Sequence, residues 1–242
     1  MLKFFRRIRQ NLVAEKKFSN YLLYGIGEIV LVVIGILIAL QINSWKQEQD
    51  NRKSEVGYLQ RFDRDLKTEL INLDREIGDL NAQLSSLDSC LYYLSMKEIE
   101  KKESIAEGLR QLSQINNVIP TRAAFTEFTA SGDAKIIRNR ELINKLYSYY
   151  ELMETTTSNL VGSNREYSRN TFMPYVMGLI PFDEGAYKFE TRQLNLEELA
   201  TDSFMISALG IKIAIAGSQL SNYEILRNQA QELRELISSE IE

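Results

Sequence analysis

The longest hydrophobic run in the chain covers residues 21–42 and reads YLLYGIGEIVLVVIGILIALQI. Residues 29–40 within it carry no polar side chain, and Glu28 is its only charged residue. About 20 mostly apolar residues are enough for a helix to cross a bilayer. The pattern therefore predicts one transmembrane helix over residues 21–43.

The flanks of this run carry aromatic and basic residues. The aromatic residues, expected as anchors at the two membrane interfaces, are Tyr21, Tyr24 and Trp45. The basic residues, which all precede the run, are Lys3, Arg6, Arg7, Arg9, Lys16 and Lys17. Because basic residues beside a span stay in the cytoplasm, we expect a cytoplasmic N-terminus and residues 44–242 outside. In a double-membraned bacterium this is a single-pass protein of the inner membrane with a periplasmic domain.

The basic segment, residues 1–20, has two interpretations. Apolar residues at helical spacing suit an amphipathic helix that contacts anionic lipid headgroups. The alternative is a topology signal alone. A cleaved signal peptide is less consistent with the sequence, because Gln41 and Ile42 occupy positions where a cleavage site needs small residues. We therefore favour an uncleaved signal-anchor.

One face of the predicted span carries small residues. Gly27, Gly35 and Ala39 share this face, and small residues at such spacing let two membrane helices approach closely. Glu28 lies beside it, and a carboxylate in lipid usually faces a partner or water. Its three interpretations are a solvated position near the headgroups, a polar contact across an oligomer interface, and an ion or proton role.

A long helical stalk is predicted over residues 44–97. Its apolar residues follow steps of three and four, which Asp63 alone interrupts: Val56, Leu59, Leu66, Leu70, Leu73, Ile77, Leu80, Leu84, Leu87, Leu91 and Leu94. This heptad pattern is typical of a coiled coil. The seam can meet a second copy of the chain or a later helix of the same chain, and we favour the same chain.

The remaining sequence predicts further helices and therefore an all-α fold, an antiparallel bundle. A helix over residues 105–115 precedes one that Thr121 caps and Gly132 ends. Asn139 or Asp133 begins the next, which runs to Phe172. Residues 178–201 form an extended, non-helical connection, either functional or a crossover. The final helix is predicted over residues 202–241. Its mostly apolar face consists of Leu209, Ile213, Ala216, Leu220, Tyr223, Ala230 and Ile237.

Four aromatic residues are candidates for a ligand pocket. They are Phe125, Phe128, Tyr147 and Tyr150, and such rings can line a site for an aromatic or apolar ligand. The more common role of a stripe like this is core, and we favour that interpretation.

Composition argues against several kinds of chemistry. The chain has no histidine and a single cysteine, Cys90, which removes Ser-His and Cys-His pairs and internal disulfides. We expect no catalytic residue, no cofactor and no metal. Residues 1–44 carry a net charge of +4 within a total of -4, so residues 45–242 carry -8. Such an acidic domain is not expected to bind nucleic acid.

Three segments resemble a known family. They are KFFRRIRQ, the span YLLYGIGEIVLVVIGILIALQINSW, and AAFTEFTASGDAKIIRNRELINKLYSYY over residues 123–150. They are similar to an uncharacterised family of single-span membrane proteins of Bacteroidota-type bacteria, a domain of unknown function. The resemblance implies a membrane location and a helical fold, and it supplies no activity.

These observations favour a membrane-anchored, non-enzymatic helical scaffold or interaction protein. We expect it to self-associate through the span, the stalk or both, as a homo-oligomer with the bilayer and other membrane or periplasmic proteins as partners. The alternative is a periplasmic bundle that senses a ligand and signals through a membrane partner. A third interpretation, an ion-coupled role, depends on Glu28.

Overall fold

The computed structural model describes residues 18–132, 135–175, 182–183, 188–189 and 195–241. The chain divides into two compact units, Met1–Glu55 and Val56–Glu242. The basic residues Lys3, Arg6, Arg7, Arg9, Lys16 and Lys17 lie outside the described residues, as does the side chain of Tyr21.

Helix α2 (Phe18–Met96) contains the predicted span and the predicted stalk. It ends at Lys97, whose φ of 59° turns the backbone away from the helix. In the first unit, residues 22–55 of α2 are described as helix, and the large apolar side chains of the span are exposed. An 18-residue window of this helix has a mean hydropathy of 2.6 with none of it buried. The segment is therefore long and apolar enough for a membrane anchor or a signal sequence.

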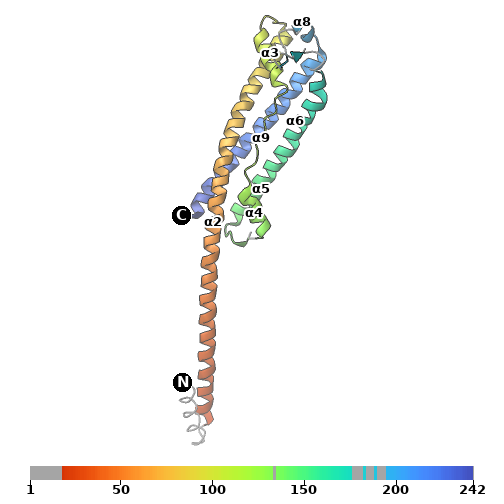
Figure 1. The fold of residues 1–242 in the computed structure, drawn as a ribbon. Coiled ribbons are helices and arrows are strands. Elements are labelled where there is room, and N and C mark those ends of the chain that lie inside the picture. The colour runs from red at the N-terminus through yellow and green to blue at the C-terminus, as the bar shows by residue number, and fades with distance from the viewer. Residues whose placement is uncertain (1–17, 133–134, 176–181, 184–187, 190–194, 242) are drawn as a thin grey trace. The chain divides into compact units, whose positions relative to one another are not determined.

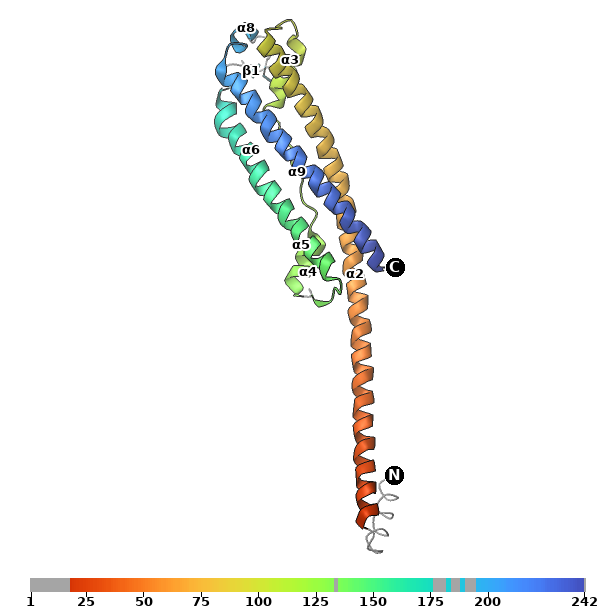
Figure 2. The same ribbon diagram turned by 180° about the vertical axis from the view of Figure 1, so that it is seen from behind.

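The second unit is an antiparallel bundle. Residues 56–96 of α2 lie beside α9 (Ser203–Ile241), and α9 also packs against α5 (Arg140–Thr155), as Figures 1 and 2 both show. Ion pairs join α2 to α9: Asp63 with Arg234 at 2.7 Å and Asp74 with Arg227 at 2.5 Å. The all-α fold is confirmed, and the stalk seam meets a helix of the same chain.

The buried face of α2 consists of two registers, each repeating every seven residues. The first contains only leucines: Leu59, Leu66, Leu73, Leu80, Leu87 and Leu94. The second contains Phe62, Glu69, Glu76, Gln83 and Cys90, so three of its five members are polar. The predicted seam contained Leu70, Ile77, Leu84 and Leu91 instead, and these residues are partly buried at its edge. The prediction omitted the second register because polar residues were assigned to solvent.

Helix α9 shows the same two-register pattern. One register contains Leu209, Ala216, Tyr223, Ala230 and Ile237, and all are buried. The other contains Met205, Lys212, Gln219, Leu226 and Leu233, also buried. Ile213 and Leu220 of the predicted face are only partly buried. Although α9 is apolar enough to cross a membrane, a third of its most apolar window is buried, as in a core helix of a bundle.

Two short helices cover the bundle's ends in Figure 1. Helix α3 (Lys102–Gln111) begins and ends earlier than the predicted 105–115, and it packs on α2 near Cys90. Helix α4 (Ala123–Ser131) ends at Gly132, whose φ of 73° is the expected left-handed cap. Its start differs from prediction, since no local side chain, including that of Thr121, caps it.

Residues 140–175 are continuously helical. Helix α5 is capped as predicted by Asn139, whose side chain accepts from the Leu142 N–H. Two π-helical segments, η2 (Thr156–Val161) and η3 (Ser168–Phe172), enclose α6 (Gly162–Tyr167). Pro174 lies two residues after the end of the second of them.

The predicted extended connection over residues 178–201 is not wholly irregular. Strands β1 (Phe182–Asp183) and β2 (Lys188–Phe189) pair antiparallel, and α8 (Leu196–Leu199) forms a helical turn that Asn195 caps. The other residues of this connection up to position 194 lie outside the described ones. Asp202 then caps α9 by accepting from the backbone N–H of Phe204 at 2.8 Å.

Candidate functional site: the buried polar layer

The segment between α3 and α4, residues 114–122, is neither helix nor strand. We call it the strap. It runs along the bundle in Figures 1 and 2. Because buried backbone N–H and C=O groups need partners, an extended segment against a core must find them on side chains. The polar residues in the buried registers of α2 and α9 supply these partners.

Two glutamines bind the strap from opposite helices. Gln83 of α2 donates to the carbonyl oxygens of Gln111 at 2.8 Å and of Gln114 at 3.2 Å. Gln219 of α9 donates to the carbonyl oxygen of Asn116 at 2.5 Å and to the hydroxyl of Tyr223 at 2.9 Å. That Tyr223 hydroxyl also accepts from the Val118 N–H at 3.2 Å. The strap therefore lies in a slot lined by amide and hydroxyl groups, rather than on an apolar seam.

Lys212 joins the strap to a third helix. Its fully buried ammonium donates to the Gln114 carbonyl oxygen and to Oδ1 of Asn164, both at 2.7 Å. Asn164 is on α6, between the two π-helical segments, and such wide turns recur at functional sites. Burial lowers the pKa of Lys212 from 10.5 to about 8. One buried cation thus connects α9, the strap and α6.

Two carboxylates of α2 bind backbone N–H groups where the strap meets α4. Glu69 accepts from the Thr121 N–H at 2.7 Å, and Asp65 accepts from the Ala124 N–H at 2.9 Å. These bonds occupy donors at and just before the start of α4, and they replace the missing local cap. Burial raises the pKa of Glu69, hydrogen bonds from Thr121 oppose this rise, and Asp65 adds to it.

Several buried polar atoms have no hydrogen-bond partner among the described residues. They include Oε1 of Glu69 and the hydroxyls of Tyr149 and Tyr150. Burial raises the pKa of both tyrosines, and the charge of Glu69 adds to the rise in each. Glu69 and Tyr149 are each 1% exposed. Buried polar atoms are normally paired, so these atoms require an explanation.

The four aromatic pocket candidates do not form one group. Phe128 packs edge-on against Phe62 of α2, with ring centroids 5.5 Å apart. Phe125 instead stacks on Tyr150 at 4.1 Å and meets Tyr147, which is 42% exposed, edge-on at 5.3 Å. These rings pack against one another and occupy the space between α2, α4 and α5.

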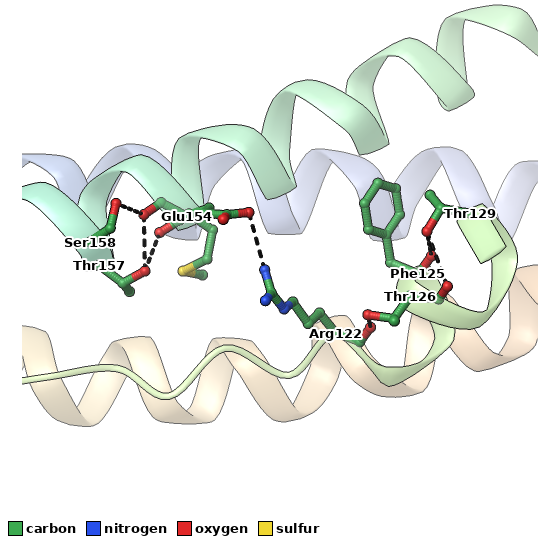
Figure 3. A network of polar contacts seen from close by, with 8 residues as sticks. Arg122, Phe125, Thr126, Thr129, Glu154, Thr157 and Ser158 are labelled. Atoms are coloured by element: carbon green, nitrogen blue, oxygen red, sulfur yellow. Dashed lines mark hydrogen bonds and ion pairs between the residues drawn. The ribbon is translucent and has the colours of Figure 1, made fainter.

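An open groove is partly lined by the strap. It has a volume of about 750 Å³ and is lined by Asn72, Ile119, Pro120, Thr121, Arg122, Ala123, Thr126, Glu127 and Ala130. Arg122 is one of the lining residues, and Figure 3 shows it directed at Glu154 of α5, with an N–O distance of 3.2 Å. Across the groove, Glu127 forms an ion pair with Arg61 of α2 at 2.6 Å.

The span candidates belong to the other unit. Gly27, Glu28, Gly35 and Ala39 lie on α2, and all four are exposed. A Cβ atom added at Gly27 or Gly35 would meet nothing within 4 Å. Trp45, a predicted anchor, is 61% exposed.

Two of the sequence expectations on chemistry concern cysteine and metals. Cys90 is fully buried, and burial raises the pKa of its thiol to about 12. In the part of the chain that the structure describes, no group of three or more His, Cys, Asp or Glu side chains could hold a metal ion.

Sequence analysis did not find the buried polar layer. Glu69, Gln83, Lys212 and Gln219 look like solvent-facing residues, because nothing in a helical pattern alone distinguishes a buried polar residue from an exposed one. One signal was present: each of them shares a seven-residue repeat with apolar residues, Phe62 and Cys90 on α2 and Met205 and Leu226 on α9.

Comparison with known proteins gives one match. Residues 28–160 match a family described as "Family of unknown function (DUF6090)". Comparison with curated proteins and with solved structures returned no match. The matched region contains most of the predicted span, the strap, Glu69 and both orphaned tyrosines. Because it covers more than half of the 242 residues, this chain belongs to the family of unknown function DUF6090.

Proposed function

We propose that this protein is a membrane-anchored, non-enzymatic helical interaction protein that self-associates through its span. The observation that carries the proposal is the exposed apolar surface of α2 between residues 22 and 42, where none of the most apolar window is buried. An apolar surface this large and continuous is stable only against lipid or another apolar helix.

The charge pattern supports one orientation for this anchor. Six basic residues precede the span, and residues 45–242 are acidic as a whole. By the positive-inside rule, the N-terminus is cytoplasmic and the bundle extracytoplasmic. In this proposal the protein is a single-pass protein of the inner membrane, and the bundle is periplasmic.

The contact surface within the membrane is the face of Gly27, Gly35 and Ala39. A Cβ added at Gly27 or Gly35 would meet nothing within 4 Å, and small residues allow the close backbone approach that stabilises membrane helix pairs. Glu28 lies beside this face, where a carboxylate can accept hydrogen bonds from a neighbouring helix. The buried seam of α2 is already filled by α9 and the strap, so that seam is not available to a second copy.

The test is the mass of the full chain in native-lipid particles. We expect a defined oligomer that Gly35→Leu and Ala39→Leu convert to smaller species. Val33→Leu is the matched control, since residue 33 lies about 160° around the helix from Gly35 and about 120° from Ala39. A monomeric wild-type protein, or an oligomer unaffected by Gly35→Leu, would contradict self-association through this face.

A second candidate function is ligand sensing by the bundle. The orphaned polar atoms near Glu69 favour it, since a bound ligand is one way to satisfy buried polar groups.

A further inference from the structure

We propose that the strap, residues 114–122, is an exchangeable occupant of its slot, and that an extended peptide segment of a partner protein binds between α2 and α9 in its place. This inference goes beyond the membrane anchor and does not depend on it. The side chains that form the slot are Glu69 and Gln83 of α2 and Lys212, Gln219 and Tyr223 of α9.

The slot binds main-chain atoms of the strap. Its donors to carbonyl oxygens, at distances between 2.5 and 3.2 Å, are Gln83, Lys212 and Gln219. Its acceptors of N–H groups, at 2.7 and 3.2 Å, are Glu69 and the hydroxyl of Tyr223. Every residue other than proline carries the same main-chain donor and acceptor. These contacts therefore fit an extended backbone, whatever its sequence.

Few side chains of the strap are held. Asn116 and Val118 are buried, whereas Ile119 is 76% exposed, and this alternation is the period of two that an extended chain shows. The Asn116 amide donates to Oε1 of Gln83 at 3.3 Å. A segment that replaces the strap needs an amide side chain and, two positions later, a small apolar residue.

The strap leaves two acceptors of its slot unused. Oε1 of Gln219 and Oε1 of Glu69 are buried and have no hydrogen-bond partner among the described residues. A primary amide can bind a peptide on two sides, by donating to a C=O group and accepting from an N–H group. The strap uses only the donor side of Gln219. Because an unpaired buried acceptor is costly, an occupant that supplies the missing donors binds better than the strap does.

Pro120 accounts for one missing donor in the strap. Proline has no N–H group, and this residue comes directly before Thr121, whose N–H binds Glu69 at 2.7 Å. A segment with any other residue at this position carries one more N–H beside the carboxylate. The strap therefore fits the slot less completely than an extended peptide without proline.

Peptide binding to the full chain in lipid particles tests the proposal. The probe is a fluorescent copy of residues 114–122, QINNVIPTR, with blocked ends, and anisotropy measures its Kd. In the chain, Val118→Gly should tighten binding by about tenfold or more, because the strap loses its buried valine while the peptide keeps one. Ile119→Gly is the matched control: it loosens the backbone equally at an exposed side chain and should change the Kd far less.

Further changes locate the bound peptide, each measured with the Val118→Gly chain. Val118→Gly in the peptide should weaken binding by about tenfold or more, whereas Pro120→Ala in the peptide should strengthen it. Adding Gln219→Leu to the chain should weaken binding by about tenfold. Gln231→Leu, at an exposed position of the same helix, should leave the Kd unchanged.

Hydrogen exchange in the wild-type chain measures displacement of the strap directly. It also provides a test if Val118→Gly unfolds the bundle. With an isotope-labelled chain and excess unlabelled Pro120→Ala peptide, the amides of Val118 and Thr121 should exchange faster, because the peptide takes their acceptors in the slot. Amides within α9 should keep their rates.

Three results would overturn the proposal or part of it. The exchange is wrong if the peptides neither bind the Val118→Gly chain nor accelerate exchange in the wild type. Binding that Gln219→Leu leaves unchanged would place the peptide outside the slot. A Pro120→Ala peptide that binds no tighter than the copy of the strap would overturn the role of the unused acceptors. None of these outcomes depends on the oligomer mass that tests the span.

Discussion

Gly108 of α3 lies against Cys90 of α2 so closely that a Cβ added to the glycine would stand 2.2 Å from the Cβ of Cys90. The same added atom would be 2.6 Å from the carbonyl oxygen of Ser86. Neither neighbour is the end of a flexible side chain, since one is a Cβ and the other is backbone. The contact fixes how closely α3 can pack on α2.

The first prediction follows from this contact. Gly108→Ala should lower the free energy of unfolding by roughly 1 to 3 kcal/mol, because the added methyl group overpacks the α2–α3 interface. Gly78→Ala is the matched control: it lies within α2 with open space around it and should raise stability by about 0.5 to 1 kcal/mol. Denaturant unfolding of the full chain measures both. Equal effects of the two substitutions would contradict the close approach.

Lys212 predicts a specific dependence of stability on pH. Its pKa in the folded protein is about 8 against 10.5 for the unperturbed side chain. Between these values the unfolded chain binds more protons than the folded chain, so stability rises with pH in this window. The slope contributed by this one group approaches about 1.4 kcal/mol per pH unit. Unfolding free energies measured from pH 7 to pH 10.5 test this.

The control for that prediction is a pair of lysine variants. Lys212→Met should remove this contribution to the slope, because no proton can then be lost at that position. Lys145→Met changes a lysine whose side chain is 41% exposed, and this variant should keep the pH slope of the unchanged protein. An unchanged slope in Lys212→Met would show that another group titrates.

Loss of the buried hydrogen bond from Gln219 to the Asn116 carbonyl oxygen should lower the free energy of unfolding. Gln219→Leu leaves the buried Asn116 carbonyl oxygen without its donor and should destabilise the protein by about 1 to 3 kcal/mol. Gln231→Leu, at an exposed position of the same helix, should change stability by less than about 0.5 kcal/mol. Chemical denaturation compares the two, and similar costs would argue against the slot that holds the strap.

Asp65 of α2 should stabilise the start of α4, because it caps that helix from a different part of the chain. Because its carboxylate accepts from the Ala124 N–H, Asp65→Ala should cost about 0.5 to 2 kcal/mol, the range measured for lost N-caps. Asp65→Asn keeps an acceptor and should recover most of this loss. Asp79→Ala, at an exposed position on α2, serves as the control. Amide hydrogen exchange at Ala124 should accelerate in Asp65→Ala alone.

The sequence by itself determined the elements of this fold that depend on neighbouring residues. The apolar run of residues 21–42, the leucines from Leu59 to Leu94, the cap at Asn139 and the left-handed Gly132 each leave a local signature, because helix periodicity, capping and positive φ are properties of short segments. These signals were sufficient to predict an all-α bundle with an apolar N-terminal helix.

Only the tertiary structure decided which polar residues are buried. Glu69, Gln83, Lys212 and Gln219 could each have faced solvent, and the strap that they bind is far from each of them in sequence. A buried polar residue is stable only when a partner from elsewhere in the chain satisfies it, and no local pattern encodes that partner. The candidate site near Glu69 depends on such pairings, and for this reason it became visible only in the folded protein.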